Sequence, residues 1–228
     1  KTWNSPWNFD QKSLRAASYF RKERCRTGAL RVSAQTAGYH GECSGQGGIR
    51  NNRHDGRNAQ EYCRSDLKET VRLISNARRV HIFCVENSAA TAVDLMTKLL
   101  YLGIDCQYYT DYYLQRISAS SLHQDDTVIA ISYSGQSKDV VDTVKIAKKA
   151  GAKVVVITNF GQTLLEKWAN VVLKAPKNKL LYGDAIFQGP TQMALIDMLY
   201  MGIILSDYEK YTHQLDKSSK VVRDKAYS

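Results

Sequence analysis

The sequence predicts an α/β fold in which a parallel sheet is covered by helices on both faces. Short apolar, β-branched runs alternate along the chain with longer segments whose apolar residues recur at helical spacing. Alternation of this kind is typical of β-α-β units, in which a crossover helix joins two parallel strands. Strands buried on both faces read as continuous apolar runs, and the run 128–131 (VIAI) is of this type.

Local signals set the expected ends of the elements. Gly103 and Gly151 each follow a helical pattern and are expected to end it. Asp111 precedes another pattern as its N-cap, and Pro176 ends the last strand. The elements expected in chain order are a helix at 67–77, a strand at 79–85, a helix at 89–102, a strand at 104–109, a helix at 112–122, a strand at 128–131, a helix from 140 to 151, a strand at 154–158, a helix at 162–169, a strand at 171–174 and a helix at 190–205.

The most informative stretch is the polar loop 132–137 (SYSGQS), which follows the strand at 128–131 and precedes a helix. Free backbone N–H groups and the helix dipole favour an anion at such a helix start. Serine hydroxyls donate hydrogen bonds to phosphate oxygens, and glycine lets the backbone approach a ligand closely. The alternative is a purely structural role, in which Ser134 or Ser137 only caps the helix. Three hydroxyls around one glycine favour a phosphate-binding loop.

The same edge of the sheet receives a second turn, because the carboxyl ends of parallel strands lie together. Glu86, Asn87 and Ser88 follow the strand at 79–85 and therefore face the serine loop. His81 lies inside that strand and is expected to be a buried core residue rather than a catalytic one. Two hydroxyl-bearing loops can thus converge on one small anionic ligand.

Composition separates the chain into parts. Residues 1–65 carry 12 Lys and Arg against 5 Asp and Glu, whereas residues 66–228 carry 20 against 17. A basic segment suggests a nucleic-acid contact, the alternative being a basic extension without a partner. Residues 38–57 lack apolar periodicity and read as loop or disorder. We expect a basic N-terminal segment at 1–65, a folded domain at 66–206 and a polar C-terminal tail at 207–228, either loose or helical.

Cysteine usage and hydropathy favour a cytoplasmic protein. An odd number of cysteines without a CxxC pair argues against a disulfide framework, and no usual zinc-ligand spacing is present, so neither a metal nor another cofactor is expected. The amino-terminal residues show no apolar signal region, and no run reaches the length of a membrane span. The five cysteines are Cys25, Cys43, Cys63, Cys84 and Cys106, of which the last two lie in apolar runs and are expected to be core residues.

Residues 66–206 resemble the SIS (sugar isomerase) domain, in the form found in RpiR-type (MurR/RpiR) bacterial transcription regulators. The stretches that carry the resemblance are 80–103, 127–159 and 191–203, with the Ser-x-Ser-Gly-x-Ser loop as the most specific feature. The resemblance implies a flavodoxin-like three-layer αβα sandwich with a five-stranded parallel sheet, which forms a homodimer or a higher homo-oligomer and binds a phosphorylated sugar.

The resemblance also assigns roles to individual residues. Ser132, Ser134, Gly135 and Ser137 match the phosphate-binding loop, and Ser88 matches a serine that contacts the sugar phosphate. The turn before Ser88 departs from the family pattern, because glutamate stands at position 86 where glycine is usual. Further sugar contacts are expected from Glu86, Asn87 and Asp184.

Two functions follow from this resemblance. The first is a phosphosugar-sensing effector domain that controls DNA binding by an attached domain; the alternative is an aldose–ketose phosphosugar isomerase. Isomerisation needs a positioned acid or base, and Glu86 is the only carboxylate in the two loops, which favours the sensor. RpiR-type regulators carry an N-terminal helix-turn-helix domain, and residues 1–65 show no recognition helix. DNA binding is therefore expected only if such a domain is intact. The composition and the apolar pattern change abruptly near residue 65, and one hypothesis for this change is a reading-frame shift in the coding DNA upstream of about that residue.

Overall fold

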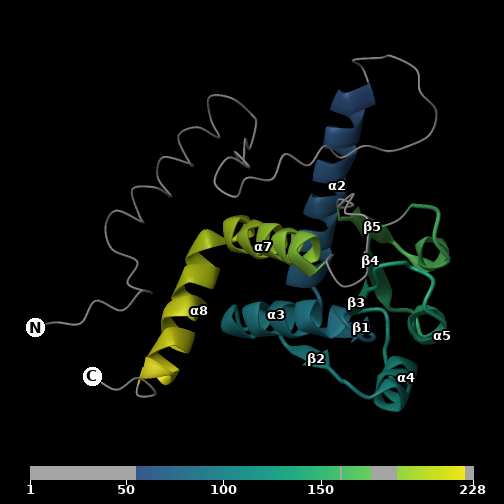
Figure 1. Cartoon of the computed structure of the whole chain (residues 1–228). Helices are drawn as coiled ribbons and strands as arrows, with labels where there is room; N and C mark the ends of the chain where they lie inside the picture. Colours follow the sequence, from purple (N-terminus) through teal and green to yellow (C-terminus); the bar gives the residue numbers. More distant parts are fainter. Residues whose placement is uncertain (1–54, 160, 176–188, 224–228) are drawn as a thin grey trace, which may run out of the picture. The chain divides into compact units, whose positions relative to one another are not determined.

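The computed structural model describes residues 55–159, 161–175 and 189–223 (Figure 1). The five strands in these ranges form one parallel sheet in the order β2-β1-β3-β4-β5. The predicted α/β class with a five-stranded parallel sheet is therefore confirmed. The elements are α2 (Asp55–Ser75), β1 (Arg79–Cys84), α3 (Ser88–Tyr101), β2 (Cys106–Tyr108), α4 (Tyr112–Ser120), β3 (Asp126–Ile131), α5 (Lys138–Lys149), β4 (Lys153–Thr158), the short 3₁₀ helix η2 (Leu165–Trp168), β5 (Val171–Lys174), α7 (Gly189–Ser206) and α8 (Tyr208–Val221).

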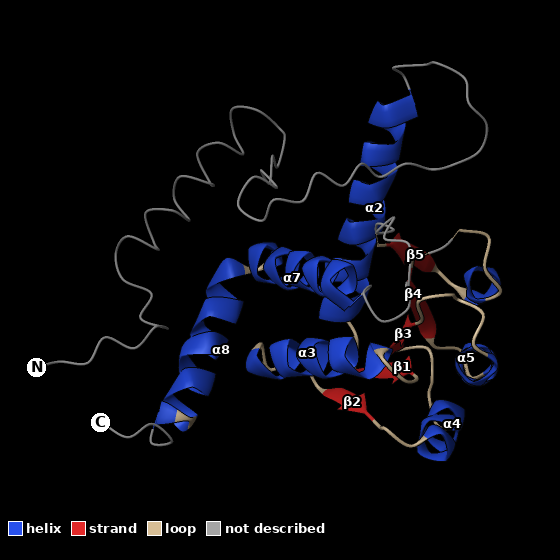
Figure 2. Cartoon of the chain, viewed as in Figure 1, coloured by secondary structure: helices blue, strands red, loops and turns tan. Residues whose placement is uncertain are grey.

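Two helical layers cover the sheet. Figure 2 shows α3 and α7 on one side of the strands and α4 and α5 on the other side. Every residue of β3 is buried, and its side chains alternate between the two layers. Ile129 and Ile131 pack into the core beneath α2, α3 and α7, whereas Val128 and Ala130 pack beneath α4 and α5. Burial on both faces explains why this strand is apolar throughout. Within the described residues, no helix combines the length and apolar character that crossing a membrane requires.

Two local expectations were wrong. The predicted helix at 162–169 is reduced to the four residues of η2, since Gln162 has a φ of +59° and the N–H of Leu165 donates to the carbonyl of Gly135 at 3.2 Å. Helix α2 begins at Asp55, inside the stretch expected to be loop, and it crosses the expected boundary at residue 65. The sequence of this first part, DGRNAQEYCRS, shows no apolar stripe, so periodicity does not reveal the helix.

The segment after residue 207 is helical, which is one of the two alternatives expected for it. Tyr211 and Leu215 of α8 are buried in the same core as α3 and α7. The hydroxyl of Ser218 donates to the carbonyl of Tyr101, which adds a polar contact at the end of α3. Residues 208–218 therefore belong to the folded domain.

Candidate ligand site at the carboxyl edge of the sheet

The serine loop and the turn before Ser88 flank the point where the strand order reverses. Strands β1 and β3 are neighbours, and Cys84 pairs with Ile131 at their carboxyl ends. Strand β2, which follows β1 in the chain, lies on one side of this central pair, and β4, which follows β3, lies on the other side. Ligands of open α/β sheets bind in the crevice outside this switch point. The topology therefore places both predicted loops beside a natural ligand position.

Two hydroxyls of the loop hold its backbone and still have protons to donate. The Oγ atom of Ser132 accepts a hydrogen bond from the N–H of Gly135 at 3.2 Å, and Oγ of Ser134 accepts from the N–H of Gln136 at 3.3 Å. A hydroxyl that acts as acceptor keeps its O–H free for another partner. Ser132 is buried and Ser134 is exposed. Ser134 can thus donate to a ligand oxygen while the loop keeps its shape.

Gly135 is required by its surroundings as well as by its backbone. Its φ is +61°, in the left-handed region, and a Cβ atom there would lie 2.6 Å from Cβ of Thr163. The carbonyl of the same residue accepts the N–H of Leu165. The glycine therefore packs the serine loop onto the segment that follows β4. The sequence predicted a glycine for close approach of a ligand, and the structure adds this internal reason.

Ser137 occupies the N-cap position of α5 but its side chain makes no capping hydrogen bond. The capping explanation therefore does not account for this hydroxyl. The N–H groups of the first turn, beginning with Lys138, have no acceptor within the helix. Together with the helix dipole they favour an anion, although Asp139 in the same turn adds a negative charge.

The turn after β1 has the shape that glycine normally gives. Glu86 has a φ of +53° and is exposed, so it adopts the left-handed conformation that glycine favours. The carbonyl of Glu86 accepts the N–H of Ala89 at 2.9 Å, which starts α3. Ser88 is the first residue of α3 and is mostly buried, whereas Asn87 is exposed. The position thus keeps a glycine-like backbone although it carries a carboxylate.

A buried polar network, which the sequence did not reveal, ties the serine loop to α3 and α7. The carbonyl of Tyr133 accepts the N–H of Asn159 at 3.1 Å, directly after β4. The side chain of Asn159 bonds to Thr191 at 3.2 Å and to Gln192 at 2.9 Å on α7, and Thr91 of α3 donates to Gln192 at 3.3 Å. These contacts join residues about 30 to 100 positions apart in the chain, so no local pattern predicts them.

The remaining predicted residues lie elsewhere. Asp184 falls outside the described residues. His81 is buried in β1 with Nδ1 on the hydroxyl of Ser118, and burial lowers its pKa. Cys84 and Cys106 are core residues as predicted, and burial raises the pKa of their thiols to about 11 and about 12.

Comparison with known proteins finds relatives that are similar in sequence and in fold. The NanR protein of Vibrio vulnificus, solved in complex with ManNAc-6P, superposes with a TM-score of 0.68 at 25% identity, covering 72% of this chain and 63% of that one. An uncharacterised HTH-type regulator of Caldanaerobacter subterraneus is 30% identical over 69% of this chain and 56% of its own length. The HTH-type regulator RpiR of Escherichia coli is 28% identical over 69% of this chain and 53% of its own.

The chain thus spans about half the length of these curated relatives. The family model of the SIS domain matches residues 73–202, which is more than half of the chain and includes both loops and most of α7. The sheet order, the serine loop and this match agree, and the chain belongs to the SIS domain family.

Proposed function

We propose that this chain contains the phosphosugar-sensing domain of an RpiR-type transcription regulator. A sugar phosphate binds at the β1/β3 edge through Ser132, Ser134, Ser137 and the Gly135 backbone, with Ser88 contacting the sugar. The observation that carries the proposal is the serine loop at the switch point of the sheet, where exposed Ser134 keeps a free proton beside the start of α5. Glu86 and Asn87 contribute sugar contacts from the facing turn.

Ligand binding controls DNA binding in this proposal. The two curated relatives described above are HTH-type regulators, which supports an attached DNA-binding domain. Binding favours one of two conformations only if the ligand has different affinities for them. The network from Tyr133 through Asn159 to Gln192 gives a direct physical connection between the ligand loop and α7.

Helices α3 and α7 provide the dimer surface that this mechanism needs. Leu100 of α3 is 51% exposed and Met201 of α7 is also 51% exposed. Asp197, the one charged residue of α7, pairs with Lys98 of α3, and this ion pair joins the two helices. Exposed apolar patches of this kind mark interaction sites. We infer a homodimer through this face.

Charging this face is expected to separate the dimer. The double variant Leu100→Lys/Met201→Lys introduces four like charges into a symmetric interface, and we expect sedimentation velocity to show a monomer where the parent chain is a dimer. Ile117→Lys on α4, where the side chain is 66% exposed, is the control and keeps the parent state. A parent monomer, or a double variant that remains dimeric, contradicts the inferred surface.

Ser134→Ala is expected to remove most of the ligand response without lowering stability. A hydrogen bond to a charged group contributes about 1.5–3 kcal/mol, so the affinity for the sugar phosphate should fall about 10- to 100-fold. The measurement is a thermal-shift screen of the full chain against sugar phosphates, including N-acetylmannosamine 6-phosphate. Ser206→Ala at the end of α7 removes a similarly exposed hydroxyl and is the control.

The same panel of sugar phosphates distinguishes the sensor from the alternative function, an isomerase. No midpoint shift with any sugar phosphate, or an undiminished shift in Ser134→Ala, counts against the sensor. A turnover assay on the same panel tests the isomerase: measurable isomerisation that Glu86→Gln abolishes would replace the sensor by an enzyme. Both variants lie on exposed side chains, so loss of folding does not confuse the result.

A further inference from the structure

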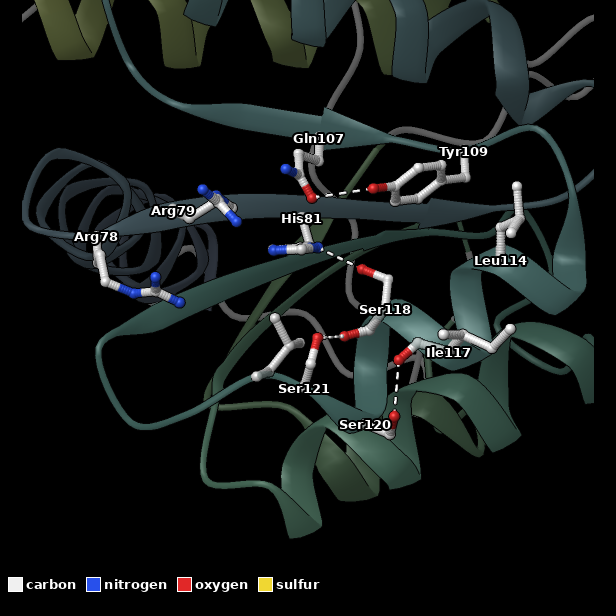
Figure 3. Close-up of a pocket in the computed structure, with 11 residues that line it drawn as sticks. Arg78, Arg79, His81, Gln107, Tyr109, Leu114, Ile117, Ser118, Ser120 and Ser121 are labelled. Atoms are coloured by element: carbon white, nitrogen blue, oxygen red, sulfur yellow. Dashed lines mark hydrogen bonds between the residues drawn. The ribbon is translucent and has the colours of Figure 1, made fainter.

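A separate cavity of about 360 Å³ lies between β1, β2 and α4 (Figure 3). It is far from the serine loop along the strands, because His81 pairs with Val128, four residues before Ser132. Four residues of strand span roughly 13 Å. The residues that determine its chemistry are Arg79, His81, Gln107 and Ser118, with Leu114 and Ile117 as its apolar side.

One ring nitrogen of His81, Nε2, can donate a hydrogen bond into the cavity. The His81 side chain is buried, Nδ1 lies 2.8 Å from Oγ of Ser118, and within the described residues Nε2 has no protein hydrogen-bond partner. The Ser118 hydroxyl can donate to Nδ1 or accept from it, so the ring can carry its proton on Nε2 when a ligand presents an acceptor. Figure 3 shows this second nitrogen on the side of Arg78 and Arg79.

Gln107 and Arg79 direct further donors to the same place. The amide oxygen of Gln107 accepts the hydroxyl of Tyr109 at 3.2 Å, so the amide NH₂ group points away from Tyr109 (Figure 3). Arg79 uses Nε to bond Asp105 at 2.7 Å, which leaves its terminal NH₂ groups available. An amide, an imidazole and a guanidinium therefore line the same cavity.

The charges limit what this cavity can hold. Asp105 pairs with Arg79, and Asp126 pairs with Arg78, so the cavity combines several donors with little net charge. A polyanion finds no excess of positive charge here. The exposed Leu114 and Ile117, on the α4 side, suit a short apolar group. We propose that this cavity binds a small monocarboxylate with a short apolar chain, its carboxylate on Arg79, His81 and Gln107.

Titration of the ¹⁵N-labelled full chain with butyrate tests the proposal. The expected result is a saturable shift of the amide signals of residues 79–81, 107 and 118, weakened at least tenfold in Arg79→Gln and unchanged in Ser134→Ala. Gln107→Leu provides a second variant with the same expected loss, should Arg79→Gln fail to fold. The serine loop takes no part, so the outcome is independent of sugar-phosphate binding.

Three results with butyrate overturn the proposal. Shifts that do not saturate, shifts centred on other residues, or binding by Arg79→Gln and Gln107→Leu that equals binding by the parent chain each exclude a carboxylate site built from these donors. Inorganic phosphate is the comparison ligand: if it saturates the same signals and butyrate does not, the cavity recognises a phosphate and the carboxylate assignment is wrong.

Discussion

Replacing Gly135 by alanine is expected to lower the free energy of unfolding by about 3 kcal/mol. A left-handed backbone at a residue with a Cβ atom costs about 1 kcal/mol, and an overpacked contact adds about 1–3 kcal/mol. Here the added Cβ atom would lie 2.6 Å from Thr163, on a segment whose Leu165 N–H is already bonded to the Gly135 carbonyl. Urea unfolding followed by circular dichroism measures the change.

Gly151→Ala is the matched control for this prediction. Gly151 has a φ of +97°, but an added Cβ atom would meet its nearest neighbour, the backbone N of Gln124, at 3.5 Å. The control therefore carries the backbone strain without the overlap, and we expect a loss of about 1 kcal/mol. Equal losses in the two variants would show that the contact with Thr163 does not determine the shape of the serine loop.

Asp126→Asn is expected to destabilise the chain by about 2 kcal/mol at neutral pH. The Asp126 side chain is fully buried and accepts two hydrogen bonds from Arg78, at 3.0 and 2.9 Å, and a third from the N–H of His123 at 3.0 Å. Loss of a buried charge with such partners costs about 3–5 kcal/mol when the other charge stays buried. The side chain of Arg78 is 47% exposed, so water compensates part of that loss.

Asp105→Asn is the comparison, because its pair with Arg79 is exposed and should contribute less than about 1 kcal/mol.

The stability of Asp126→Asn relative to the parent chain at acid pH provides a second test. Burial raises the pKa of Asp126, but hydrogen bonds from Arg78 and His123 outweigh burial and the net pKa is lowered. Stability from this carboxylate is therefore present above the unfolded pKa of about 3.9 and is lost as the pH falls through the lowered value. The deficit of Asp126→Asn should shrink in that range; a deficit that grows there contradicts the assignment.

The sequence predicts most of the fold because the inner strands are buried on both faces. Such burial leaves an apolar run, and Val128 to Ile131 shows it clearly. The position of the serine loop follows from the same reasoning, because a parallel topology puts the end of β3 beside the end of β1. Asp111 was predicted as the N-cap of α4 from its residue type alone, and its carboxylate accepts the N–H of Leu114 at 2.9 Å.

What the sequence does not predict depends on contacts between distant segments. The contact of Gly135 with Thr163 explains a glycine that the pattern assigned only to ligand approach. The bonds of Asn159 to α7 leave no periodic signal, since each residue alone reads as an ordinary polar position. The short η2 replaces a predicted helix for a related reason, because the Leu165 N–H is used by the serine loop.

The binding of a sugar phosphate by the serine loop is tested most directly by amide NMR signals. The ligand that gives the largest thermal shift is added to the ¹⁵N-labelled chain at increasing concentration. We expect saturable shifts for residues 134–139 and 86–89, at the two loops that flank the β1/β3 edge. Saturable binding with shifts only in other parts of the chain, and none in these two loops, would contradict the account.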